Sequence, residues 1–158
     1  MCAMFNNALT VVRGALAIGI LAAALCAQAE PVRLGLWLAG DAQDARRAVV
    51  ELLVDGNLMF GRVERVVGKD GKEVQEICDR CPGEMAGRPM KGLVFITGLR
   101  REGSRWVRGK VVSLEPGWRR GMTGNCDLEV KDGQLHFHGY RWRIGRREVW
   151  PPFDGEKP

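Results

Sequence analysis

Turn residues divide the chain at short, regular intervals, and this spacing limits the folds that it can adopt. Glycine, usually beside Asp, Asn or Pro, recurs at 40, 55–57, 69–71, 101–103, 115–117 and 131–133. Such residues favour tight turns because glycine accepts a positive φ and proline presets φ. The runs between the turns are short, rich in β-branched and aromatic residues, and mostly alternate apolar with other positions, which is typical of strands. We expect eight strands, at residues 33–38, 47–54, 58–67, 92–99, 105–113, 122–130, 134–140 and 144–150.

Eight consecutive strands with short connections predict an all-β fold, an eight-stranded antiparallel up-and-down barrel. Closing the sheet removes its exposed edges, and the interior of a barrel of this size holds side chains or one small ligand. The run at 92–99 is apolar on both faces, so we expect it to be central in the sheet. The parity of the apolar positions changes near Gly139, which predicts a bulge or corner at that glycine.

The first 29 residues have the composition of a secretory signal. An apolar run at 14–25 follows Arg13 and ends in Ala27-Gln28-Ala29, a small-x-small cleavage pattern. The run is too short to span a bilayer, which needs about 20 apolar residues. We therefore expect cleavage after Ala29, a barrel domain at 30–150 and a C-terminal tail at 151–158, in the periplasm or outside the cell. Lipid anchoring at Cys26 is disfavoured because a leucine, not a small residue, precedes it.

The net charge by itself excludes few classes of binding partner. The net charge of the whole chain is +5, and the basic residues are spread among strand positions. Nucleic-acid binding would need exposed aromatics interleaved with the basic residues, so we expect no nucleic-acid partner. Contact with an anionic membrane surface stays open.

The first expected strand contains Gly35-Leu36-Trp37, which resembles the Gly-x-Trp of lipocalins and related calycin-type barrels. In those proteins the Trp closes one barrel end, and an Arg near the last strand lies across it. The resemblance implies that role for Gly35 and Trp37, with Arg146 or Arg147 making the cation–π contact.

A longer series of motifs runs through the chain after residue 34. Its segments are Gly35-x-Trp37, Gly61-Arg62-Val63, Arg88-Pro89-x-x-Gly92-Leu93, Trp106-x-x-Gly109, the turn at 115–117, Leu135-x-x-x-Gly139-Tyr140 and Gly145-Arg146-x-x-x-Trp150. This series resembles an exported bacterial family of unknown function with a lipocalin-like barrel. The resemblance implies a periplasmic β-barrel without established enzymatic activity, which binds a small apolar molecule and can form a homodimer.

Cleavage would leave three cysteines, Cys78, Cys81 and Cys126. An oxidising compartment favours a disulfide, and we expect Cys126 to bond to Cys78 or Cys81. Closing about 45 residues in this way would contribute about 4 kcal/mol in the chain-entropy model. A bridge between Cys78 and Cys81 is the alternative. Zinc is a second alternative, because the three thiols with His136 or His138 would complete a tetrahedral Cys3His set.

The residues point to a binding protein more than to an enzyme. No catalytic constellation and no cofactor site is evident, and the first hypothesis is a barrel that holds a small hydrophobic or amphipathic molecule. A cell-envelope structural or interaction protein with a filled barrel is the alternative. The candidate lumen residues are Trp37, Phe60, Phe95, Trp106 and Phe137. The candidate portal or partner contact is formed by Trp118, Arg119 and Arg120, next to the turn at 115–117.

Overall fold

The computed structural model describes residues 32–155, and the predicted signal segment at 1–29 lies outside this range. The fold is all-β, as expected, and each of the eight expected strands is present. A two-residue strand and a 3-10 turn in the long segment at 69–93 have no counterpart in the prediction. The elements are β1 (Val32–Ala39), β2 (Arg46–Asp55), β3 (Leu58–Gly68), β4 (Glu73–Val74), η1 (Gly83–Met85), β5 (Val94–Glu102), β6 (Arg105–Val112), β7 (Thr123–Lys131), β8 (Gln134–Arg141) and β9 (Ile144–Trp150).

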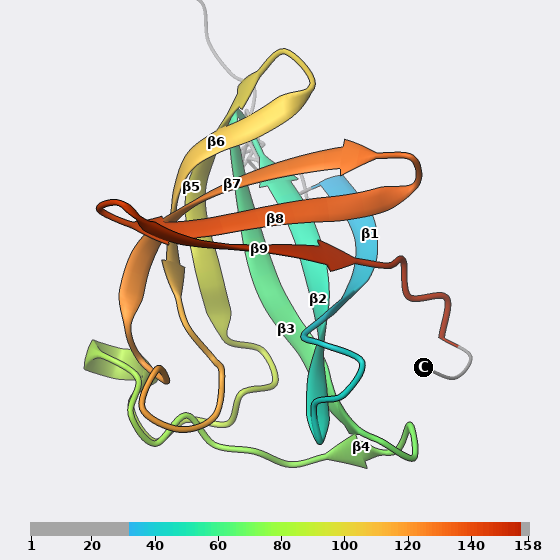
Figure 1. Cartoon of the computed structure of the whole chain (residues 1–158), viewed down its shortest axis with the longest axis vertical. Coiled ribbons are helices and arrows are strands. Elements are labelled where there is room, and N and C mark those ends of the chain that lie inside the picture. Colours follow the sequence, from blue (N-terminus) through green and yellow to red (C-terminus); the bar gives the residue numbers. More distant parts are fainter. Residues whose placement is uncertain (1–31, 156–158) are drawn as a thin grey trace, which may run out of the picture.

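The strands form one antiparallel sheet whose spatial order follows the sequence. The order is β1-β2-β3-β5-β6-β7-β8-β9, and β4 pairs with the end of β3. The sheet curls around a single interior into a half-barrel (Figure 1). This up-and-down arrangement is compatible with the lipocalin-like class, and β5 lies centrally, as the apolar run at 92–99 predicts. Within residues 32–155 there is no helix long and apolar enough to cross a bilayer.

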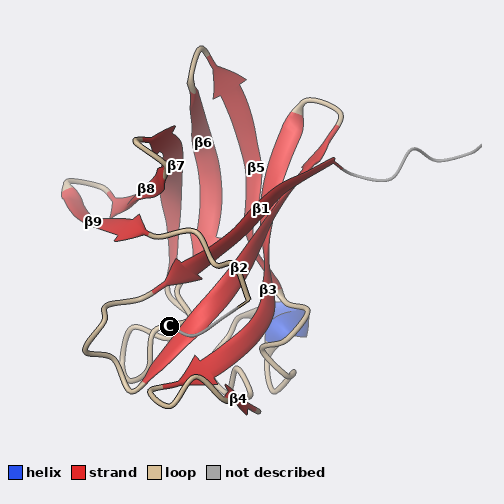
Figure 2. Cartoon of the chain, turned by 90° about the vertical axis from the view of Figure 1, so that its right-hand side faces the viewer, coloured by secondary structure: helices blue, strands red, loops and turns tan. Residues whose placement is uncertain are grey.

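The chain that follows β9 joins the last strand to the first at one end of the sheet (Figure 2). The N–H of Leu38 donates to the carbonyl of Pro151 at 3.0 Å, and the N–H of Phe153 donates to the carbonyl of Leu36 at 2.9 Å. Phe153 also packs on a small cluster outside the main core, formed by Leu38, Val49 and Val67. The first residues of the expected tail therefore act as a short strap that closes this end of the sheet.

Apolar side chains fill the space that the sheet encloses. Alternation along β3 places Met59 and Val63 inside, at 2% and 0% exposure. Glycine is needed at 109 because a Cβ there would lie 2.5 Å from Cγ of Leu99 on the neighbouring strand β5. The largest fully buried side chains are Leu52, Met59, Ile96, Leu99, Leu128 and Leu135.

The bulge expected at Gly139 is not formed. β8 keeps a continuous register with both β7 and β9 through that position, whereas register shifts occur in β1, β2, β6 and the β3–β5 pair. Glycine is required at 139 for a different reason: a Cβ there would lie 2.9 Å from the ring of Phe137. The parity of the apolar residues changes because the hairpin turns at Trp142, and Trp142 and Ile144 leave the core.

Candidate functional site

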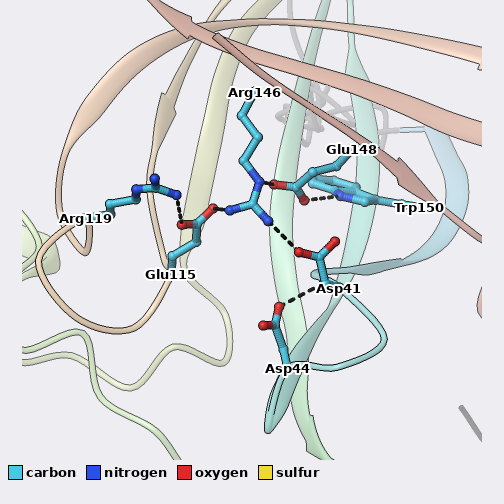
Figure 3. Close-up of polar contacts among 7 residues, drawn as sticks. All are labelled: Asp41, Asp44, Glu115, Arg119, Arg146, Glu148 and Trp150. Carbon is cyan, nitrogen blue, oxygen red and sulfur yellow. Dashed lines mark hydrogen bonds and ion pairs between the residues drawn. The ribbon is translucent and has the colours of Figure 1, made fainter. Parts of the chain in front are cut away.

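One end of the half-barrel is held by a network of charges around Arg146 (Figure 3). Arg146, on β9, reaches Asp41 in the β1–β2 loop at 2.8 Å and Glu115 in the β6–β7 loop at 2.7 Å. It also contacts Glu148, two residues along β9, at 3.0 Å. A single guanidinium thus connects three segments that are far apart in the sequence. Its planar fork of donors suits this role, because it can serve several carboxylates at once.

Burial makes Glu148 the electrostatically unusual member of the network. Its side chain is 13% exposed, and desolvation raises its pKa above the ordinary carboxyl value, although the Trp150 hydrogen bond and Arg146 act in the opposite direction. The indole N–H of Trp150 donates to Glu148 at 2.8 Å. Trp150 in turn stacks on Phe137 with ring centroids 4.8 Å apart, so the network is anchored to the core. This arrangement fixes the loops, and each of the three guanidinium nitrogens of Arg146 already contacts a carboxylate.

The resemblance to lipocalins implied a different place for this arginine, and that expectation is wrong. Within residues 32–155 the cation–π contacts are Arg65 over Phe153 and Arg119 over Trp118, so neither Arg146 nor Arg147 lies across Trp37. Trp37 is 7% exposed, and its indole N–H has no hydrogen-bond partner in the described part of the chain. Arg146 turns toward the loops because three carboxylates converge there. Arg147 is exposed on β9, at the position paired with His138.

The five lumen candidates do not surround one cavity. Trp37, Phe95 and Phe137 are 7–8% exposed and pack in the main core. Phe60 is half-buried and belongs to neither cluster of buried side chains. Trp106 is half-buried at the rim and packs against the core from one end. The deep interior is therefore filled by the protein's own side chains, and space for a ligand is found at the surface openings instead.

The larger opening is a groove of about 800 Å³ at the end of the sheet formed by the β2–β3 and β5–β6 hairpins. Its apolar wall consists of Leu34, Val54, Leu58 and Trp106, and Arg100 and Arg101 bring positive charge to the same groove. Leu34 and Leu58 are 41% and 44% exposed, which is high for side chains of this kind. The groove also includes Gly56 and Asn57 of the β2–β3 turn. We name this opening the rim groove.

The two arginines of the rim groove are not neutralised by the rest of the described chain. Arg100 forms no ion pair there, and the polar side-chain contact of Arg101 within residues 32–155 is a hydrogen bond from Nε to the carbonyl of Gly103 at 3.2 Å. The neighbouring acid, Glu102, pairs with Arg108 instead. Arg101 is paired with Trp106 across the β5–β6 hairpin, so a cation lies next to an aromatic wall. The rim groove is thus both apolar and positively charged.

The cysteines adopt the pairing that was the alternative. Cys78 and Cys81 form a disulfide across a three-residue separation, and Cys126 is a free, buried cysteine. The expected bridge from Cys126 is wrong, because Cys126 is on β7 with its sulfur close to Gly109 of β6, whereas the segment at 78–81 turns back on itself. Burial raises the pKa of Cys126 to about 12. The described residues contain no group of three potential metal ligands, so Cys126, His136 and His138 do not gather with the bridged pair.

The expected portal residues point in different directions. Trp118 is 71% exposed on the β6–β7 loop, with Arg119 stacked over its ring at 5.1 Å. Arg120 is instead 11% exposed and ion-paired with Glu76 at 2.5 Å and Asp79 at 3.2 Å. Arg120 therefore fixes the long 69–93 segment to the β6–β7 loop and is not available to a partner. Only Trp118 and Arg119 remain as a surface feature.

Sequence reasoning named Arg146 but missed its partners. Asp41 follows Gly40 and Glu115 precedes Pro116, so both acids belong to turns and have no periodic signal. Arg100 and Arg101 of the rim groove were missed because their sequence positions are indistinguishable from ordinary solvent-exposed strand positions. The hairpin expected around the 101–103 turn did offer a way to find them. Residues on either side of a hairpin turn lie opposite one another, so the partners of these arginines on the next strand could have been inferred.

The comparisons with known proteins identify a family and add no activity. Residues 35–151 match the family model described as an uncharacterised protein conserved in bacteria, DUF2147. No curated protein and no solved structure matches the chain. The matched range extends from the Gly-x-Trp segment through β9 to the start of the strap. The chain belongs to this family of uncharacterised proteins conserved in bacteria.

Proposed function

We propose that this protein is an exported, non-enzymatic binding protein for a small amphipathic molecule with an anionic head, and that it binds this molecule in the rim groove. The observation that carries the proposal is the combination of an apolar wall with Arg100 and Arg101, neither of which has an acidic partner in the described chain. Export is supported by the apolar run at 14–25 and the Ala27-x-Ala29 pattern.

The two parts of the groove would recognise the two parts of such a molecule. An alkyl or ring portion against Leu34, Val54 and Leu58 loses contact with water, which contributes about 0.8 kcal/mol for each buried CH₂ group. A carboxylate or phosphate accepts hydrogen bonds from the arginines, and charge-assisted bonds of this kind are roughly twice as strong as neutral ones. Affinity should therefore increase with chain length and fall when the head is esterified.

Binding at the rim is favoured over binding in the deep interior. Leu99, Ile96 and Leu128 occupy the interior at 0–1% exposure, so a ligand there would have to displace core side chains. Displacement of this kind costs stability, since tightly packed interiors tolerate added volume poorly. The rim groove needs no such rearrangement, because its volume of about 800 Å³ is already open.

Fluorescence titration with parinaric acid and with its methyl ester tests the proposal. We expect the acid to bind more tightly than the ester, and the double variant Arg100→Gln with Arg101→Gln to remove this preference. Leu58→Gln should weaken both probes because it makes the apolar wall polar. Lys69→Gln with Arg88→Gln removes the same charge in the exposed 69–93 segment, at the opposite end of β3 and β5, and serves as the matched control. Equal affinity of the wild type for acid and ester, or no binding of either, would count against the proposed function.

A filled barrel that acts as an envelope interaction protein is the second candidate. The observation in its favour is the packed interior together with Trp118, which is 71% exposed beside Arg119. Native mass spectrometry of protein purified from its own host separates the two candidates. A retained small-molecule adduct supports the binding protein, and a bare polypeptide that retains an envelope protein supports the second candidate.

A further inference from the structure

The hairpin that connects β8 and β9 ends in an exposed apolar tip. Its two-residue turn is Trp142-Arg143, flanked by the paired residues Arg141 and Ile144. Trp142 is 92% exposed and Ile144 83%, the highest values among the exposed large apolar side chains. The hairpin extends sideways from the sheet, on the left of Figure 1. We name residues 141–144 the hairpin tip.

The backbone conformation at Trp142 is unfavourable, and contacts within the chain do not offset its cost. Trp142 has φ of +60°, a left-handed conformation that is an outlier for a bulky side chain and costs about 1–2 kcal/mol. Glycine or asparagine is the usual choice at such a turn position. A tryptophan with 92% of its surface in water gains almost no packing within the chain to offset this cost.

Positive charge surrounds the apolar tip. Arg141 and Arg143 are exposed, and neither forms an ion pair with another residue in 32–155. Arg141 and Trp142 also line a second groove, of about 530 Å³, which includes Lys110. Among the described residues Lys110 bonds only to the amide oxygen of Asn125, so no carboxylate there neutralises its charge. No acidic residue lines this groove.

We propose that the hairpin tip docks this protein on the surface of an anionic lipid bilayer. Tryptophan prefers the headgroup level of a bilayer, where its ring contacts acyl chains and its N–H contacts water and carbonyls. Ile144 adds a second apolar group beside it. Arg141 and Arg143 flank Trp142 at the turn and would complement lipid phosphates. Each basic residue near an anionic surface contributes about a fivefold gain in affinity.

A bilayer fits the shape of the tip better than a folded protein does. The tip is a two-residue hairpin turn with Trp142 and Ile144 almost fully exposed, so a rigid partner would need a matching apolar pocket with acidic sides. A fluid headgroup layer adapts to a short wedge of two side chains and supplies negative charge all around it. The inference does not rest on the rim groove, because the two features share none of their residues.

Vesicle binding of the mature chain beginning at Glu30 provides the test, since this chain keeps every described strand and lacks the apolar run at 14–25. The probes are vesicles of phosphatidylglycerol mixed with phosphatidylcholine and vesicles of phosphatidylcholine alone. We expect binding to the anionic vesicles, weakening with salt over the range in which the Debye length shrinks from about 30 to 8 Å. Brominated acyl chains should quench the emission of Trp142.

Three variants make the result specific to the tip. Trp142→Asn suits the left-handed turn, so it should fold at least as stably as the wild type, yet bind anionic vesicles about tenfold more weakly or worse. Arg141→Gln with Arg143→Gln should lose roughly tenfold or more. Lys69→Gln with Lys131→Gln removes the same charge elsewhere and should leave vesicle binding nearly unchanged.

Three outcomes would overturn the inference: no preference for anionic vesicles, undiminished binding by folded Trp142→Asn, or an equal loss in the two charge variants. Retention of an acidic protein by the tip, with no vesicle binding, would also overturn it and identify a protein partner. Parinaric acid binding by the tip variants should match the wild type. A protein that binds parinaric acid but not vesicles would therefore contradict only this inference. A protein that binds vesicles but not parinaric acid would contradict only the proposed function of the rim groove.

Discussion

Replacing Arg146 by methionine tests whether its charge network holds the loops at one end of the half-barrel. Methionine keeps much of the apolar stem of arginine and removes the guanidinium. The side chains of Asp41 and Glu115 are 65% and 35% exposed, so each of their ion pairs with Arg146 contributes about 0–1 kcal/mol. The side chain of Glu148 is only 13% exposed, and leaving its charge unpaired is the larger loss, because an unpaired buried charge can cost about 3–5 kcal/mol.

The expected loss of stability is smaller than the value for a fully buried pair. Arg146 is itself 38% exposed, so water screens part of the interaction and also reaches Glu148 once the arginine is gone. We therefore expect Arg146→Met to lower the free energy of unfolding by about 2–3 kcal/mol at neutral pH. Urea denaturation followed by tryptophan fluorescence measures this change, with the slope of the transition expected to stay the same.

The loss should depend on pH with a definite sign. The pKa of Glu148 is already raised by burial in the folded state, and removal of Arg146 raises it further. A carboxyl whose folded pKa lies above its unfolded value is most favourable when protonated, and its contribution becomes worse as pH rises through the interval between the two values. The difference in stability between wild type and variant should therefore be small below the unfolded carboxyl pKa of 4.5 and reach its full size above the raised pKa of Glu148.

A double-mutant cycle assigns the effect to the right pair. Glu148→Gln keeps an acceptor for the indole N–H of Trp150 and removes the charge, so Arg146→Met should cost about 1–2 kcal/mol less in that background. If Arg146→Met costs under about 0.5 kcal/mol, the value usual for an ordinary surface change, the network is not structural. An unchanged cost at acid pH, or no coupling to Glu148, would likewise refute the reasoning.

Three further changes test other parts of the fold. Gly109→Ala would place a Cβ 2.5 Å from Leu99 and should cost about 1–3 kcal/mol by overpacking, which thermal unfolding measures; an unchanged melting temperature would contradict this packing. Cys81→Ser opens a loop of only a few residues, so we expect a loss near 2 kcal/mol by denaturant titration, and a loss near 4 would favour the longer bridge instead. Phe153→Ala removes the apolar contact of the strap and should increase amide hydrogen exchange in β1, while unchanged exchange would show that the strap adds nothing.

The strands could be predicted because they depend on local information. Each turn carries glycine or proline at the position where the backbone needs it, and the side-chain period of two marks the runs between turns. The expected ranges 47–54 and 144–150 differ from β2 and β9 by at most one residue at either end. The expected range 92–99 was the exception, since β5 begins at Val94 and extends to Glu102, where the hairpin turns at Gly103 and Ser104.

The contacts between distant segments could not be predicted in the same way. Whether Cys78 meets Cys81 or Cys126 depends on how the 69–93 segment folds back, and the sequence allows each pairing. Arg146 was recognised, yet its partners were not, because Asp41 and Glu115 are in turns whose mutual position only the curled sheet decides. The rim groove likewise unites residues from β1, the β2–β3 hairpin, β5 and β6.

Alternation and turn chemistry therefore determined by themselves that this chain forms a sequence of antiparallel strands with one apolar face. Tertiary structure alone decided which side chains fill the interior, which end is strapped by Phe153 and which charges stay unpaired at the rim. The physical reason is the range of the interactions. Backbone preference and side-chain period act over a few residues, whereas packing and ion pairing depend on the three-dimensional approach of segments up to 105 residues apart, as between Asp41 and Arg146.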